Sequence, residues 1–204
     1  MVFPFLSLFL FFTSAKINTV QLDLSSYESI EKCANNILRK FPKIDIIVNN
    51  AGTLNQTLEY INGLEHTFFV NYFGHFYLIN LLYKRILACD TLVINMSSIA
   101  HAMLNEKDVK YDFIFESKSK TDTNSNLLYR REYNFSKLCM LYYTQQLQIR
   151  HHLTVHHKIY EYLTNGIIIT TFYFMLRKKN VGGTVKDVLK NKNKLRGKVV
   201  IITG

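Results

Sequence analysis

Between residues 17 and 150, short apolar runs alternate with longer amphipathic stretches. Apolar and polar residues alternate over 19–24, which predicts a strand with one buried face. Two uninterrupted apolar runs, at 44–50 and 91–97, predict parallel strands that are buried on both faces. The pattern therefore predicts three strands with amphipathic segments between them.

Each predicted strand is followed by residues with helical periodicity. The first helix begins at Ser25, which forms a capping box with Glu28, and it ends before Pro42. Apolar residues recur at helical spacing over 64–87 and again over 130–150. This order predicts an α/β fold: an incomplete Rossmann-like doubly wound parallel sheet with helices on both faces, in three layers.

The segments outside this core differ from it in composition. The chain divides into an apolar extension (1–16), a partial Rossmann-like core (17–150), a divergent apolar segment (151–176), a basic linker (177–197) and an isolated first strand of a further Rossmann unit (198–204). The tail strand is expected to pair beside 44–50, because its apolar face has no other place to go. Within the core, the polar stretch 99–128 predicts a loop insertion.

The apolar run at the N-terminus extends over eleven residues, from Val2 to Phe12. It is shorter than the ~20 residues of a membrane-spanning helix. It also lacks the basic residues that precede the core of a signal peptide. We expect a non-native or anchoring extension, which in the second case makes peripheral membrane contact.

Composition restricts the classes of protein to which the chain can belong. Hydrophobic residues make up 48% of the chain and charged residues 20%, which excludes a disordered or collagen-like protein. Cys33, Cys89 and Cys139 are widely spaced and form no Cys-x-x-Cys pair, so neither a disulfide framework nor a thiolate zinc site is expected. Free cysteines favour the cytoplasm or the cytosolic face of an intracellular membrane.

The formal charge of +10 is concentrated towards the end of the chain. Nine Lys and Arg side chains but only one Asp lie within 177–198, which is typical of a solvated linker rather than a folded basic face. No specific nucleic-acid binding is therefore expected. The histidine-rich segment 151–157 contains no carboxylate or Cys to complete a ligand set, so no metal site is expected.

Two short motifs carry candidate chemistry. The segment Asn49-Asn50-Ala51-Gly52 follows a buried strand, and its small residues let a ligand approach the backbone, although an ordinary turn has the same composition. Tyr133 and Lys137 share one face of a helix, where the ammonium favours the phenolate form that a general acid–base needs. With 13 tyrosines in the chain, about one such pair arises by chance.

Two further positions are polar within otherwise apolar surroundings. Ser97-Ser98 lies at the carboxyl end of a buried strand, where a hydroxyl can polarise a substrate carbonyl. Asn71 lies within a long helix, where a helix-interior carbonyl beside it can hold a water molecule. A turn serine and an exposed or hydrogen-bonded asparagine are the ordinary alternatives.

The order of these features carries more information than any one of them. The chain reads LDLSS at 22–26, IDIIVNNAG at 44–52, FFVNYFGHF at 68–76, LVINMSS at 92–98 and YNFSKLC at 133–139. With these motifs on these elements, residues 17–150 resemble the short-chain dehydrogenase/reductase family, and within it the retinol-dehydrogenase-like branch. The separation of 35 residues between Ser98 and Tyr133 is also typical of that branch.

The resemblance implies an oxidoreductase that uses NAD or NADP and acts on a small lipophilic alcohol or carbonyl compound, such as a retinoid, steroid or xenobiotic. Tyr133 would be the acid–base, and Lys137 would lower its pKa and hold the nicotinamide ribose. Ser98 would orient the carbonyl or hydroxyl group, and Asn71 would anchor a proton-relay water.

The resemblance also implies cofactor-binding residues. Asp23 would touch the adenine ring, while Asn50, Ala51 and Gly52 would pass along the adenosine side of the cofactor. Tyr133 and Lys137 would complete the nicotinamide side. The choice between NAD and NADP stays open, because the residues that select the cofactor follow a strand that the sequence does not match.

The sequence departs from the family pattern around its first strands. No glycine-rich phosphate-binding turn precedes Asp23, and the family's second strand is also missing there. Residues 198–204 instead read as the family's first strand and the start of its glycine motif. We expect a chain joined from the back of one copy and the front of a tandem neighbour, rather than a circular permutant. The alternative function is a catalytically incompetent fragment or remnant of such an enzyme.

Overall fold

The computed structural model describes residues 18–55, 58–104, 114–115, 131–152 and 198–204. The elements in chain order are α2 (Tyr27–Lys40), β1 (Ile46–Asn49), β2 (Tyr60–Ile61), β3 (Leu64–Glu65), α3 (His66–Phe68), the π-helix η1 (Phe69–Phe73), α4 (Gly74–Cys89), β4 (Leu92–Asn95), the 3₁₀-helix η2 (Ile99–Met103), α5 (Arg131–His152) and β5 (Val200–Thr203). The extension 1–16, the linker 177–197 and most of 151–176 lie outside the described residues.

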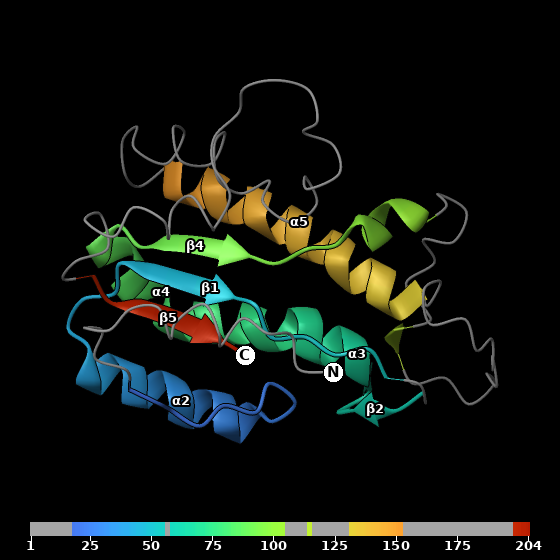
Figure 1. Ribbon diagram of the computed structural model, residues 1–204, viewed down its shortest axis with the longest axis horizontal. Helices are drawn as coiled ribbons and strands as arrows, with labels where there is room; N and C mark the ends of the chain where they lie inside the picture. Colours follow the sequence, from blue (N-terminus) through green and yellow to red (C-terminus); the bar gives the residue numbers. More distant parts are fainter. Residues whose placement is uncertain (1–17, 56–57, 105–113, 116–130, 153–197) are drawn as a thin grey trace, which may run out of the picture.

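A three-stranded parallel sheet forms the centre of the molecule, in the order β4-β1-β5 (Figure 1). Ile46 at the start of β1 is in register with Leu92 of β4 on one side and with Val200 of β5 on the other. The adjacent parallel strands predicted at 44–50 and 91–97 are therefore confirmed. The expected pairing of the tail strand beside 44–50 is confirmed as well.

The strand predicted over 19–24 is wrong, because these residues form no ladder with any described strand. The segment nevertheless keeps the burial pattern of a strand. Leu24 is buried, and Val20 and Leu22 pack against the core cluster that contains Ile47. Both sides of β1 are occupied by β4 and β5, so a further strand can only join outside them. Alternating hydrophobicity predicts which side chains are buried, but it does not supply a hydrogen-bonding partner.

Three helices pack on the face of the sheet that carries Ile47. That core cluster combines Ile30 and Ile37 of α2, Leu78 and Leu82 of α4, and Met140 and Tyr143 of α5. Ile46, Val48 and Ile94 lie on the opposite face and cluster only with strand residues in the described part of the chain. Right-handed crossovers between strands that follow one another in the same direction place their helices on one face. The α/β class with a parallel sheet is confirmed, whereas a second helical layer stays a prediction.

The first helix, α2, is capped one residue later than the sequence indicated. Ser26 is the N-cap residue, and its hydroxyl accepts the N–H of Ser29. Ser25 instead binds the carboxylate of Asp23 through its N–H and its hydroxyl. Glu28 pairs with Lys32 one turn along the helix rather than closing a capping box.

The helix predicted over 64–87 runs from His66 to Cys89 and contains a π-turn near its N-terminal end, η1. It starts late because Leu64 and Glu65 pair with β2 in a short antiparallel hairpin that the sequence did not predict. The Glu65 carboxylate then accepts the N–H of Phe68 at 2.8 Å and caps the helix. None of the described helices is both long and apolar enough to cross a membrane.

Gly74, at the start of α4, lets this helix approach the segment before α2. A Cβ atom at this position would lie 2.5 Å from the carbonyl oxygen of Leu24. Even the smallest side chain would therefore push the two segments apart. The remaining predicted loop, 99–128, begins with the 3₁₀-helix η2, and most of its later residues lie outside the described part.

Candidate active site at the carboxyl ends of the strands

The segment Asn49-Asn50-Ala51-Gly52 leaves the carboxyl end of β1 and is held by two elements that are distant in the sequence. The hydroxyl of Thr203, on β5, accepts the N–H groups of Asn50 and Ala51 at 2.9 and 3.1 Å. The carbonyl of Ala51 accepts a hydrogen bond from Nε2 of His75, on α4, at 2.9 Å. Both ends of the Ala51 residue are therefore fixed, and Gly52 is left exposed beside them.

Asn71 is fully buried within the π-helix η1 and holds the next part of the same loop, at Thr53. Its Oδ1 accepts the N–H of Thr53 at 2.7 Å, and its Nδ2 donates to the carbonyl of Thr53 at 2.8 Å. Nδ2 also lies 3.4 Å from the hydroxyl of Ser136 on α5. The side chain thus joins the loop after β1 to α5. π-Turns inside α-helices are frequent at functional sites.

Tyr133 and Lys137 lie one turn apart on α5, as their spacing predicts. The Nζ atom of Lys137 is 5.6 Å from the centroid of the Tyr133 ring and donates to the carbonyl of Met96 at 3.2 Å. Only 6% of Lys137 is exposed. Burial lowers the pKa of Lys137 to about 8, because a cation removed from water is stabilised less.

The two serines after β4 have different partners. Ser97 donates its hydroxyl hydrogen to the carbonyl of Lys137 at 2.9 Å and so fixes α5 against the strand. Ser98 caps η2 by accepting the N–H of Ala100 at 3.3 Å. Within the described part of the chain, the hydroxyl of Ser98 acts only as an acceptor, so its hydrogen could be donated to a substrate. This arrangement favours Ser98 over Ser97 as the substrate-orienting residue.

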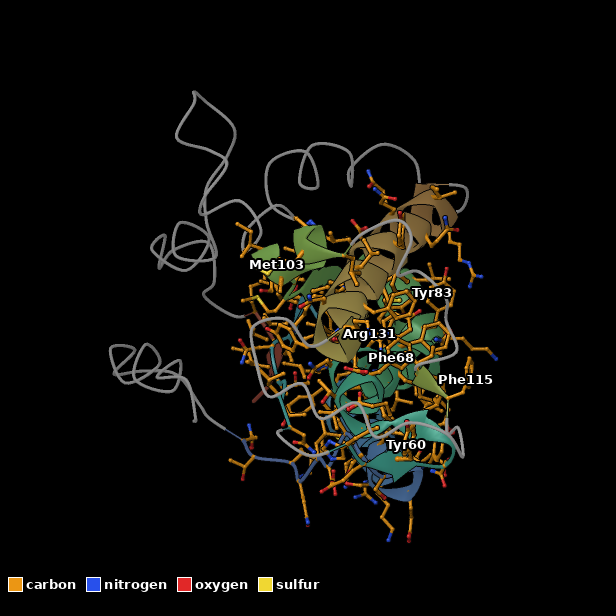
Figure 2. All side chains as sticks on the ribbon, turned by 90° about the vertical axis from the view of Figure 1, so that its right-hand side faces the viewer. Tyr60, Phe68, Tyr83, Met103, Phe115 and Arg131 are labelled. Carbon is orange, nitrogen blue, oxygen red and sulfur yellow. The ribbon has the colours of Figure 1, made fainter. Side chains whose placement is uncertain are left out.

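Asn71 and Lys137 meet at Gly52. A Cβ atom on Gly52 would lie 3.1 Å from Oδ1 of Asn71 and 3.6 Å from Nζ of Lys137. On the other side of α5, the ring of Phe135 stacks on Phe68 at 5.7 Å, and Figure 2 shows Phe68 next to the first turn of this helix at Arg131. Helix α5 is therefore packed directly on the start of the helix that carries Asn71.

The chain is similar in sequence to known proteins. Residues 12–112 match the family model described as short chain dehydrogenase. Retinol dehydrogenase 13 of Mus musculus is 32% identical over 139 residues, which are 66% of this chain and 38% of that protein. The chain belongs to the short-chain dehydrogenase/reductase family. Because the resemblance of the motifs is to the same family, that identification from the sequence is confirmed.

This short-chain dehydrogenase/reductase chain is also similar to two further proteins. The human WW domain-containing oxidoreductase is 34% identical over 140 residues, 67% of this chain and 33% of that protein. A solved short-chain dehydrogenase from Streptomyces avermitilis has a TM-score of 0.48 and 17% identity, over 72% of this chain and 47% of that chain. The chain spans about two-fifths of the length of the first curated relatives that it matches.

Asp23 occupies a separate position in this family member. It lies at the end of the extended segment before α2, and its carboxylate accepts the N–H of Ser25 at 2.9 Å. Hydrogen bonds from the Ser25 hydroxyl and N–H lower the pKa of Asp23. Within the described residues, the hydrogen bonds of the Asp23 carboxylate go to Ser25. None of them joins Asp23 to Gly52, Asn71 or Lys137. Contact with an adenine ring stays a prediction.

Thr203 and His75 are the residues of the site that the sequence did not single out. Thr203 lies at the carboxyl end of an apolar strand, and His75 follows Asn71 by four residues on the same helical run. That spacing was a usable signal, because positions i and i+4 share a face. Thr203 carried no comparable signal, because its partners precede it by more than 150 residues.

A row of buried polar side chains also crosses the sheet below the site. Nδ2 of Asn49 donates to Oδ1 of Asn95 at 2.7 Å, and Nδ2 of Asn95 donates to the hydroxyl of Thr144 at 2.9 Å. Buried amides that are bonded to each other in this way fix the strands and α5 in one arrangement.

Proposed function

We propose that this chain contributes the catalytic centre of an NAD- or NADP-dependent oxidoreductase that acts on a small lipophilic alcohol or carbonyl compound. The observation that carries the proposal is the burial of Lys137 beside Tyr133, at the place where Asn71 and the backbone of Gly52 meet. A buried cation next to a phenol is the arrangement that general acid–base chemistry by tyrosine requires.

The residues around Gly52 fit a nicotinamide cofactor. Gly52 is exposed, and a Cβ atom at this position would lie only 3.6 Å from Nζ of Lys137, so its backbone is accessible next to Lys137. Lys137 has three N–H donors, and Met96 accepts one of them, so donors remain for ribose hydroxyls. Lys137 would hold the ribose, while Asn50, Ala51 and Gly52 would pass along the adenosine side and Asp23 would contact the adenine. When bound, the nicotinamide supplies or accepts the hydride.

The side chains of this protein transfer the proton and orient the substrate. The hydroxyl of Tyr133 gives a proton to the oxygen of a carbonyl substrate, or takes one from an alcohol. The cation of Lys137 lies beside the Tyr133 ring and would offset the negative charge that develops on the Tyr133 oxygen during the reaction. The free hydrogen of Ser98 binds the same substrate oxygen and holds it in place. Asn71 keeps the π-helix and the loop at Thr53 together, beside the backbone that would carry a relay water.

The lipophilic substrate class is supported by the surface that follows Ser98. Ile99 and Met103 of η2 are 50% and 45% exposed, and Figure 2 labels Met103 at the outer end of this element. Exposed apolar side chains next to a catalytic residue are typical of a binding surface for an apolar compound. The name of retinol dehydrogenase 13, the relative described above, is consistent with such a substrate.

A binding experiment followed by a single substitution tests the proposal. The full chain is titrated with NADPH and with NADH by fluorescence, and submicromolar binding of either one is expected. Tyr133→Phe should leave this affinity within about twofold and reduce turnover of retinaldehyde by about 10²–10⁴-fold. The substitution Tyr142→Phe, at an exposed position of the same helix, should change neither value. If neither cofactor binds, the chain is the catalytically incompetent remnant.

A further inference from the structure

His75 is a buried histidine that the chemistry described above does not use. It lies in the first turn of α4, directly after the π-helix, and none of its surface is exposed. Its Nε2 atom lies 2.9 Å from the carbonyl oxygen of Ala51, whereas its Nδ1 atom is buried and has no hydrogen-bond partner among the described residues. A fully buried imidazole with a single partner is unusual, because buried polar atoms are nearly always satisfied.

We propose that His75 is a positioning residue, which fixes the peptide between Ala51 and Gly52 in the orientation that the cofactor requires. The inference deepens the proposed function and rests on it, because it assigns a role to His75 in the same cofactor site. His75 acts on the loop through the carbonyl of Ala51 and does not touch the reacting atoms.

The hydrogen bond determines where the proton of the ring lies. A carbonyl oxygen can only accept, so Nε2 carries the hydrogen and Nδ1 does not. Burial lowers the pKa of His75 to about 4, and the charge of Lys137 also disfavours a second proton, although the bond to Ala51 opposes this. The ring therefore stays neutral near pH 7, with one N–H group directed at one carbonyl.

The orientation of that carbonyl determines the orientation of the next N–H group. The peptide bonds of the described residues are all trans, and a trans peptide is planar with its C=O and N–H pointing in opposite directions. The carbonyl of Ala51 points at α4, so the N–H of Gly52 points away from it. Gly52 is exposed, and the side on which a Cβ atom would stand faces Asn71 and Lys137.

Thr203 and Asn71 bind the loop on either side of the peptide between Ala51 and Gly52, and His75 binds the carbonyl of that peptide. Thr203 holds the N–H groups of Asn50 and Ala51, and Asn71 holds both the N–H and the carbonyl of Thr53. Without the bond from His75, the partly buried carbonyl of Ala51 would lose this hydrogen bond. A rotated peptide would direct a different group towards the cofactor.

A matched pair of substitutions separates the N–H donor from the volume of the side chain. His75→Gln keeps an N–H donor at a similar reach, and His75→Met has a similar length without any donor. We expect His75→Met to raise the Kd of NADPH at least tenfold and His75→Gln to stay within about threefold of the parent chain. Ile79→Val, one turn further along α4 and also fully buried, should lower the melting temperature but leave the Kd within twofold.

Amide hydrogen exchange of the cofactor-free chain gives a readout that does not depend on binding. In His75→Met, the amides of residues 50–53 should exchange at least tenfold faster, while those of the last two turns of α4 stay unchanged. Equal Kd values and equal exchange rates in the Met and Gln variants would overturn the inference. If the parent chain binds neither NADPH nor NADH, the proposed function fails, and hydrogen exchange alone then decides whether His75 fixes the loop.

The parent chain provides a third measurement in case the methionine variant does not fold. The ¹⁵N chemical shifts of the His75 ring should show the Nε2–H form between pH 6 and 8. A ring protonated on Nδ1 alone could not donate to Ala51 and would exclude the proposed role.

Discussion

Lys137 combines two properties at the scale of the single residue: it is almost completely buried, and it is charged near neutral pH. Burial lowers its pKa from 10.5 in the unfolded chain to about 8 in the folded protein. Between these two values the unfolded chain binds more protons than the folded one, so the free energy of unfolding rises with pH in this window.

Replacing Lys137 by Met should therefore remove a pH dependence of stability. From pH 8 to 10.5, the parent chain should gain roughly 3 kcal/mol relative to Lys137→Met, by the usual conversion of a pKa difference to free energy. Urea unfolding of both chains at several pH values measures this difference. Lys84→Met, at an exposed position of α4, is the control and should leave the pH dependence as it is in the parent. A constant difference between the parent and Lys137→Met across this range would contradict the buried cation.

At the scale of whole elements, Gly74 determines how closely α4 approaches the segment before α2. In an ordinary helix, a Gly→Ala substitution stabilises by about 1 kcal/mol. Here the added Cβ would meet the carbonyl oxygen of Leu24 at 2.5 Å, so Gly74→Ala should destabilise by about 1–3 kcal/mol. The reverse substitution Ala88→Gly, at an exposed position of the same helix, should destabilise by about 1 kcal/mol. Chemical denaturation of both variants tests the close approach, and a stabilised Gly74→Ala variant would contradict it.

The strand β5 is attached to the sheet by a carboxylate as well as by its ladder. Asp45 accepts from Lys43 at 2.8 Å, from Lys198 at 3.0 Å and from the N–H of Val199 at 3.0 Å. Burial alone would raise the pKa of Asp45, but these three hydrogen bonds outweigh it and lower the pKa to about 2. A carboxyl group whose folded pKa is depressed contributes stability above its unfolded pKa and loses it as the pH falls.

Asp45→Asn should therefore loosen β5 more than any other element. The amides of residues 200–203 should exchange faster in this variant at pH 7, while those of α4 keep their protection. In the parent chain, the same loosening should appear as the pH falls from about 4 towards 2. Asp90→Asn, at the exposed C-terminal end of α4, is the control for loss of one negative charge. Unchanged exchange of β5 in Asp45→Asn would show that the ladder alone holds this strand.

The stability of the whole molecule depends on its strand edges. The segment 19–24 packs its apolar side chains on the core but has no ladder hydrogen bonds to a described strand, and Ile202 of β5 is 38% exposed. Unpaired strand edges associate with one another, and a few unsatisfied groups are comparable to the ~5–15 kcal/mol that stabilise a domain. We therefore expect the chain to aggregate when expressed alone and to melt below about 50 °C.

A charge on the strand edge tests the origin of this aggregation. Ile202→Lys places a cation on β5, and natural edge strands use lysine to prevent pairing between copies. Light scattering during heating should decrease in this variant. Ile149→Lys makes the same change at an exposed position of α5 and should decrease scattering less. Equal scattering from the two variants would show that total charge, rather than the strand edge, controls association.

The parts of this fold that could be predicted from the sequence are those that depend on local patterns. The apolar runs at 44–50 and 91–97 and the periodicity of 130–150 located their elements to within a few residues. The strand at 19–24 failed because a ladder needs a partner, and periodicity does not report one. The π-helix around Asn71 and the bond from Thr203 to the loop were not predicted at all, since both depend on contacts between distant segments. Tyr133, Lys137, Asn71 and Gly52 were identified by motif order, and the structure places Gly52 next to Asn71 and Lys137, with Lys137 beside Tyr133; the catalytic roles stay predictions.

The pairing of β1 with β5 has a consequence for how the sheet assembles. Val199 and Asp45 are hydrogen-bonded although more than 150 residues separate them, and β5 is the last of the described strands to leave the ribosome. During synthesis, β1 can pair early with β4, but its other side stays open until the tail arrives. Closing so long a loop is slow, and chains with distant contacts fold slowly. Strand β5, whose Thr203 holds the loop at Ala51, is therefore synthesised late. Until it pairs with β1, nascent copies of the chain have time to pair with each other.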